Sequence, residues 1–194
     1  MKAPKFLKLA LAAVAMAALG GPAHAQQKVI LTLNWTPYGL HVGPVLAKER
    51  GLYKAAGLDV DIVRGYGSGE SVKRTAMGAT TFALADAGSV ALGRDKGLLT
   101  RQIATILDRS SDSMYFRKGS GISKPKDLEG KTIGIAAAES HLAYFPVFAK
   151  NAGIDTTKVK WVTFTPPAKI PGLMAGSVDA VMTYTTQEPT LDAP

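Results

Sequence analysis

The stretch KVILTLNWTPYGLHVGPVLAKERGLYKAAGLDVDIV, residues 28–63, holds the unit from which the rest of the fold can be predicted. It begins with an apolar run typical of a strand and ends with residues 58–63, where apolar and acidic side chains alternate as in a second strand. Between them, residues 42–57 carry apolar side chains at helical spacing, with a break expected at Gly51 and an end at Gly57. This order of strand, helix and strand predicts an α/β fold with a parallel sheet.

The same alternation continues toward the middle of the chain. A short helix is predicted over 71–78, a strand of small residues over 82–86, a helix from Ser89 and a further strand over 101–109. Residues 117–131 are then diluted by Gly, Ser, Pro and Lys, which indicates a surface connection or a domain junction.

Beyond this junction the pattern begins again. Strands are predicted over 131–136, 158–164 and 177–184, with helices over 140–153 and 168–176 between them. The second half of the chain is therefore predicted to form an α/β unit of its own.

The first 25 residues have the features of a secretory signal peptide. Three lysines precede a short apolar run, and small residues, Ala23 and Ala25, mark the expected cleavage site. The run is shorter than the roughly 20 residues that a membrane-spanning helix needs. We expect cleavage after Ala25 and an exported, periplasmic protein.

Composition excludes several classes of function. The chain has no cysteine, so a disulfide framework, a thiolate zinc site and a cysteine nucleophile are excluded. The formal net charge of +8 includes the leader lysines, and the other basic residues are scattered among acids, so no nucleic-acid partner is expected. The histidines outside the leader are far apart in sequence, which disfavours a metal site.

Candidate ligand contacts follow from the topology, because ligands of open parallel sheets collect at the carboxyl ends of the strands. Structural alternatives exist for several of these residues: Trp35 could cap a core edge, Asp86 could cap a helix, and the glycine-rich loop after the second strand could be only a tight turn. No nucleophile–base motif is present, so the residues indicate recognition and not catalysis. The candidates are Asn34, Trp35, Tyr38, His41, Tyr66, Ser68, Asp86, Ser89, Ser140 and His141.

Residues 33–89 resemble the first domain of the periplasmic substrate-binding proteins of ABC importers, in the branch that binds sulfonates, nitrate and thiamine-pyrimidine precursors. The features that carry the resemblance are the Asn34–Trp35 pair, His41, AKERGLYKAAGLDVDI, the glycine loop GYGSG and FALADAGS. KPKDLEGKTIGI (124–135) and AGSVDAVMTY (175–184) are similar to the second domain of that family.

The resemblance implies a two-lobed periplasmic binding protein type II fold that closes on a small molecule. It implies a first lobe over 26–110 and a second lobe with the start of the hinge return over 111–194, truncated before the chain returns to lobe one. The hinge side would add Tyr184 and Glu188 to the ligand contacts. The expected partners are a small polar ligand, either planar and nitrogenous like a pyrimidine or similar to a sulfonate or nitrate, and the membrane permease of an ABC importer. The expected protein is a monomer and not an enzyme, with no cofactor and no metal.

The alternative is an exported enzyme of thiamine-pyrimidine metabolism. The same superfamily includes a fungal enzyme that makes the thiamine pyrimidine and needs a cysteine-rich motif and iron, and a chain without cysteine cannot match that motif.

Overall fold

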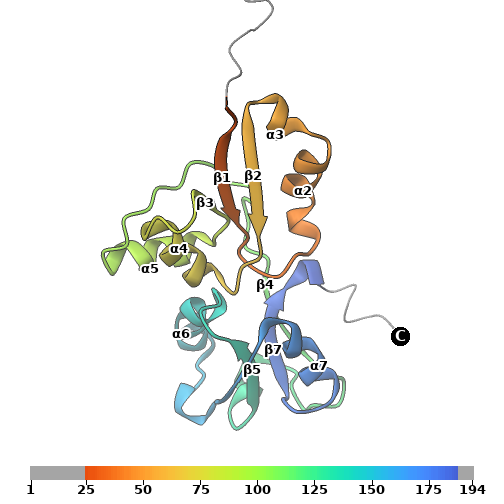
Figure 1. Ribbon diagram of the computed structural model, residues 1–194. Helices are drawn as coiled ribbons and strands as arrows, with labels where there is room; N and C mark the ends of the chain where they lie inside the picture. Colours follow the sequence, from red (N-terminus) through yellow and green to blue (C-terminus); the bar gives the residue numbers. More distant parts are fainter. Residues whose placement is uncertain (1–24, 188–194) are drawn as a thin grey trace, which may run out of the picture.

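The computed structural model describes residues 25–187, which form two α/β lobes joined by an extended segment (Figure 1). We call residues 25–98 the N-terminal lobe, residues 99–111 the connecting segment and residues 112–187 the C-terminal lobe. Most of the expected signal peptide and the candidate Glu188 lie outside the described residues. Within 25–187, no helix has both the length and the apolar character needed to cross a membrane.

The N-terminal lobe is built on a parallel three-stranded sheet of order β2-β1-β3. Its strands are β1 (Gln27–Thr32), β2 (Leu58–Val63) and β3 (Phe82–Ala83). The arrowheads of β1 and β2 point toward the C-terminal lobe in Figure 1. The loops that follow the strands therefore reach the junction between the lobes, where the topology placed the candidate residues.

The helices of this lobe lie on opposite sides of β1 and β2, with α2 and α3 on one side and α4 and α5 on the other (Figure 1). The predicted break at Gly51 and end at Gly57 are confirmed, because both residues adopt the left-handed φ that glycine tolerates, +70° and +74°. The helix predicted over 71–78 begins three residues earlier, at Ser68. The elements are a 3₁₀ turn η1 (Gly39–His41), α2 (Val42–Glu49), α3 (Leu52–Ala55), α4 (Ser68–Ala76) and α5 (Ala87–Asp95).

The connecting segment corrects one prediction, since residues 101–109 form no strand. A strand needs the edge of a neighbour, and in the described part of the chain the backbone of 101–110 makes no hydrogen bond to another backbone. Ile103 and Ile106 remain 75% and 58% exposed, so the apolar burial that would stabilise a paired strand is missing. The strand predicted over 101–109 is therefore wrong for the part of the chain that the structure describes, where no other strand pairs with these residues.

The C-terminal lobe contains a mixed four-stranded sheet of order β4-β7-β5-β6. The strands predicted over 131–136, 158–164 and 177–184 are confirmed as β5, β6 and β7. β4 was not predicted; it pairs antiparallel with β7, with Met114 opposite Met182. The strands are β4 (Asp112–Phe116), β5 (Thr132–Ala136), β6 (Lys160–Phe164) and β7 (Ala180–Tyr184).

Two helices and several 3₁₀ turns connect these strands. Pro146 lies inside the longer helix without ending it, because its exposed position leaves the Leu142 carbonyl that lost its hydrogen bond near water. The elements are η2 (Pro125–Leu128), α6 (His141–Ala152), η3 (Thr156–Lys158), η4 (Pro166–Ala168), α7 (Lys169–Met174) and η5 (Thr185–Gln187).

Most of the buried apolar core lies in the C-terminal lobe. Its main cluster joins the β-sheet to α6, and the N-terminal lobe has fewer buried apolar side chains, including Val29, Leu33, Val60 and Val72. The C-terminal cluster is Leu128, Ile133, Ile135, Phe145, Ala149, Ile154, Val159, Ala180 and Met182.

Candidate functional site between the lobes

The loop after β1 forms a hydrogen-bonded unit of Asn34, Tyr38 and His41. The backbone N–H of Tyr38 donates to Nδ1 of His41 over 3.2 Å, so Nδ1 is the acceptor of the ring. Nε2 therefore carries the hydrogen and donates to Oδ1 of Asn34 over 2.8 Å. Because this bond occupies the Asn34 oxygen, the NH₂ group is the donor side of this amide. It lies beside the Tyr38 hydroxyl, where its hydrogen bonding partly offsets the rise in the pKa of Tyr38 that burial causes.

Burial keeps this imidazole neutral. His41 is 1% exposed, and desolvation lowers its pKa to about 4. A neutral ring with a defined tautomer can orient Asn34 without adding a charge to the junction.

Aromatic side chains from both lobes meet beside this unit. Tyr38 stacks on Tyr184 of β7 with ring centroids 5.7 Å apart and planes 5° from parallel. Trp35 contacts Tyr184 edge-on at 6.4 Å and is only 2% exposed, in a cluster with Ala136 of β5. Trp35 therefore packs between the two lobes, as the core alternative for this residue required.

The C-terminal lobe contributes a buried polar network at the start of α6. Nε2 of His141 lies 3.0 Å from both the Thr183 carbonyl and Oδ1 of Asp112. Because a carbonyl only accepts, Nε2 carries a hydrogen. Burial raises the pKa of Asp112. The hydrogen bond and the electrostatic attraction that His141 provides outweigh burial, so the pKa of this carboxyl is lowered. The Ser140 hydroxyl joins the same network, 3.2 Å from the hydroxyl of Tyr184.

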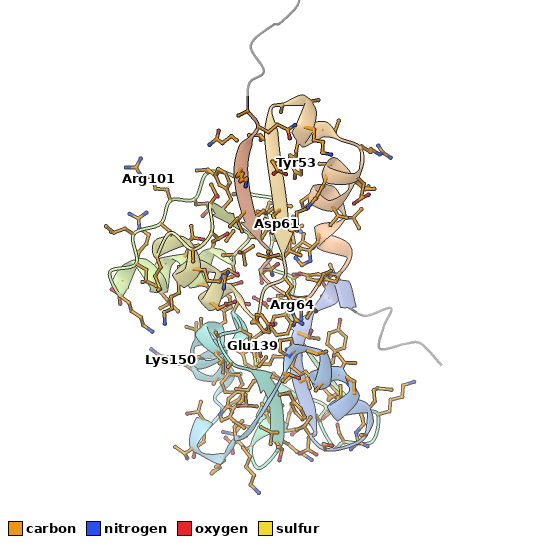
Figure 2. The ribbon with its side chains drawn as sticks, viewed as in Figure 1. Tyr53, Asp61, Arg64, Arg101, Glu139 and Lys150 are labelled. Carbon is orange, nitrogen blue, oxygen red and sulfur yellow. The ribbon has the colours of Figure 1, made fainter. Side chains whose placement is uncertain are left out.

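A buried ion pair lies behind Trp35. Nζ of Lys169 on α7 is 2.6 Å from Oε2 of Glu139 and 4.9 Å from the centre of the Trp35 ring. Burial lowers the pKa of Lys169, and the charge of Glu139 opposes this shift. Figure 2 shows Glu139 close to the junction of the lobes. The pair thus positions the Lys169 ammonium against the Trp35 ring.

The start of α5 has a side-chain cap from its own lobe. Asp86 caps α5 by accepting from the Ser89 backbone over 3.1 Å, and its own backbone N–H donates to the hydroxyl of Ser68 over 3.0 Å. The ring of Tyr66 is 49% exposed and carries the Arg64 guanidinium at 4.3 Å.

A cavity of about 720 Å³ lies between the N-terminal sheet and the connecting segment and extends to the junction. This volume is within the usual range for small-molecule sites. Leu31, Phe82 and Leu84 make its inner wall apolar. Polar and aromatic residues border its end at the junction: Asn34, Tyr38, Asp86, Asp112, Tyr144 and Tyr184.

The structure therefore divides the predicted site residues into two groups. Those on the cavity are Asn34, Tyr38, Asp86 and Tyr184. Those held in packing or hydrogen bonds beside it are Trp35, His41, Ser68, Ser89, Ser140 and His141, all buried. Tyr66 faces outward.

Four residues at the junction were missed by sequence reasoning: Asp112, Glu139, Tyr144 and Lys169. Glu139 precedes the predicted pair Ser140 and His141 in the loop after β5, and Tyr144 lies one helical turn after His141. The rule that ligand contacts follow strand ends could therefore have been extended to both residues. Asp112 and Lys169 carry no such signal, because β4 was not predicted and Lys169 follows a proline-rich turn.

The architecture has counterparts among solved structures. The periplasmic aliphatic sulphonate binding protein SsuA from Escherichia coli matches with a TM-score of 0.56 at 14% identity, over 85% of this chain and 57% of that protein. The chain has the α/β fold of the two-lobed type II periplasmic binding proteins.

Sequence comparison then gives the family. The profile of the family described as NMT1/THI5 like matches residues 39–193, and the chain belongs to this family. It is 29% identical to the formylaminopyrimidine-binding protein of Halalkalibacterium halodurans, over 97% of this chain and 58% of that protein. It is 28% identical to a 4-amino-5-hydroxymethyl-2-methylpyrimidine phosphate synthase of Saccharomyces cerevisiae, over 55% of this chain and 32% of that protein. The chain thus spans less than two thirds of the length of either relative.

Proposed function

We propose that the chain is the solute-binding component of an ABC importer and captures a small, planar, nitrogen-bearing ligand of the pyrimidine kind between its lobes. It would work after export, in the periplasm, and deliver its ligand to the membrane permease. The family and the named ligand of the bacterial relative support this class of molecule.

One observation carries the proposal: an oriented amide stands beside two aromatic rings where the cavity meets the junction. Asn34 has its oxygen engaged by His41, so a ring nitrogen or carbonyl of a ligand would accept its N–H donors in place of the Tyr38 hydroxyl. Tyr38 and Tyr184, one from each lobe, stack on each other beside the cavity, and Tyr184 is 5% exposed, so a heterocycle would gain a flat ring face from each lobe when the lobes open. A ligand held this way contacts both lobes at once and favours their closure.

The test is calorimetric titration of the full chain with formylaminopyrimidine, an aliphatic sulfonate and nitrate. Formylaminopyrimidine is expected to bind, and Asn34→Asp is expected to weaken binding at least about tenfold, because aspartate keeps the oxygen for His41 but replaces the donor NH₂ with an acceptor. The matched control is Asn151→Asp on the exposed end of α6, which should bind like the wild type. Binding of an anion alone, or unchanged affinity in Asn34→Asp, would contradict the proposed ligand class.

The synthase relative favours a second candidate, an exported enzyme of thiamine-pyrimidine metabolism. Mass spectrometry of a pyrimidine incubated with the chain distinguishes the two. A binding protein returns the ligand unchanged, whereas an enzyme yields a product that accumulates with time.

A further inference from the structure

Tyr144 of α6 crosses from the C-terminal lobe to the start of α5 in the N-terminal lobe. Its hydroxyl donates to Oδ1 of Asp86 and accepts from the backbone N–H of Gly88 over 3.1 Å. Asp86 receives the Ser89 N–H on the same oxygen, so the hydroxyl completes the cap of the helix. One side chain thus joins the two lobes through two hydrogen bonds, of which one is charge-assisted.

A second direct contact lies beside the first. The backbone N–H of Gly69 at the start of α4 donates to the carbonyl of Ala138 in the loop before α6, over 3.1 Å. Ala138 has φ of +60°, which non-glycine residues rarely adopt. The backbone is held in this unusual conformation where its carbonyl faces the other lobe.

Glycines allow the lobes to approach this closely. A Cβ on Gly88 would lie 2.4 Å from the hydroxyl oxygen of Tyr144, and a Cβ on Gly67 would lie 2.3 Å from the Ala138 carbonyl oxygen. A side chain at Gly67 would clash with backbone of the other lobe, and one at Gly88 would displace the Tyr144 ring or the lobes themselves.

We infer that Tyr144 is a closure residue, which holds the two lobes together in the absence of ligand through Asp86 and the Gly88 N–H. These contacts involve protein groups only, so closure by Tyr144 does not depend on the proposed ligand. Burial and the Asp86 carboxylate raise the pKa of Tyr144, so its hydroxyl remains a donor at ordinary pH. If the proposed function holds, a ligand that binds the closed form gains apparent affinity in proportion to the closed fraction.

The test measures the separation of the lobes in the ligand-free chain. The chain has no cysteine, so Lys54→Cys and Lys150→Cys, exposed positions in different lobes, can be labelled specifically for energy transfer. Tyr144→Phe is expected to raise the open-to-closed ratio roughly tenfold, because it removes the donor to Asp86. Gly88→Ala should also open the lobes, and this effect should disappear in a Tyr144→Ala background, where the added methyl group meets no ring.

Two controls separate closure from a general loss of structure. Tyr53→Phe removes a hydroxyl far from the junction (Figure 2), and Gly43→Ala adds a methyl group to a helix where nothing lies within 4 Å. Both should leave the lobe separation unchanged, and circular dichroism should show all variants folded. An unchanged separation in folded Tyr144→Phe and Gly88→Ala would overturn the inference.

Titration with formylaminopyrimidine separates this inference from the proposed function. Faster ligand dissociation from Tyr144→Phe, together with a wider ligand-free separation, supports the closure role. Weaker binding without a change in the ligand-free separation would make Tyr144 a direct ligand contact and overturn it. If formylaminopyrimidine does not bind the wild type, the proposed ligand fails, while the energy-transfer result still decides the role of Tyr144.

Discussion

Single residues at the junction show how one side chain can meet the requirements of both folding and recognition. Trp35 lies where a ligand-stacking residue was expected, but its ring is covered by Tyr184, Ala136 and Lys169. Asp86 borders the cavity, yet its oxygen is already shared by Ser89 and Tyr144. A polar or aromatic residue at a strand end therefore predicts a position near the ligand cavity better than it predicts contact with the ligand.

For Trp35 the burial predicts a large effect on stability. Trp35→Ala should lower the free energy of unfolding by about 3–5 kcal/mol, because it leaves a cavity between the lobes and removes the ring beneath Lys169. Urea denaturation followed by circular dichroism measures this change. Trp161→Ala on β6 is the matched control, since Trp161 is 37% exposed and should cost clearly less. Equal losses in the two variants would show that Trp35 is not a core residue.

The lowered pKa of His41 predicts that the stability of the chain falls as the pH falls. Its pKa falls from 6.5 to about 4 on folding, so between these values the unfolded chain binds a proton that the folded chain does not. Stability should therefore be complete above about pH 6.5 and fall by up to about 1.4 kcal/mol per unit as the pH drops toward about 4.

Urea midpoints between about pH 7 and about pH 4.5 test this dependence. His41→Gln, which cannot titrate, should lose most of the slope in that window. If the urea midpoints of the wild type and of His41→Gln changed with pH in parallel, a group other than His41 would cause the pH dependence.

At the scale of elements, the connecting segment shows that a predicted strand forms only where another strand can pair with it. Residues 101–109 were predicted as a strand, while the backbone of 101–110 makes no hydrogen bond to another backbone among the described residues and its apolar side chains are exposed. β4, directly after it, has a shorter pattern but forms a strand because β7 offers an edge. Strand formation here follows the available partner and not the local pattern.

This difference predicts a contrast in amide hydrogen exchange. Amides of residues 101–110 should exchange at nearly unprotected rates, while those of β5 and β7 should be strongly protected, because only the latter donate within a sheet. Hydrogen–deuterium exchange with mass spectrometry compares peptides from the three regions. Strong protection of 101–110 would mean that the segment pairs as a strand after all.

At the scale of the molecule, the two lobes differ in how much core each holds. The main apolar cluster lies within the C-terminal lobe, and the contacts between the lobes are mostly polar or aromatic. Such an arrangement suits lobes that move relative to each other, since polar contacts can exchange with water on opening.

The unequal cores predict that the lobes unfold in order. The N-terminal lobe should lose protection at lower urea than the C-terminal lobe, because it buries fewer apolar side chains. Exchange of β1 and β5 amides measured at increasing urea follows the two lobes separately. A single transition shared by both strands would show that the junction couples the lobes into one cooperative unit.

The sequence by itself determined the alternation of strands and helices, the helix ends at Gly51 and Gly57, and the position of Asn34 and Asp86 at strand ends that border one cavity. These features depend on side-chain periodicity, backbone conformation and strand polarity, which neighbouring residues or a simple topological rule specify. The tertiary structure decided that residues 101–109 form no strand among the described residues and that β4 runs antiparallel to β7. It also decided that the Trp35 ring is buried against Lys169 and that Tyr144 reaches Asp86. Each of these involves groups far apart in the chain, and their energies depend on distances and burial that exist only once the lobes have formed.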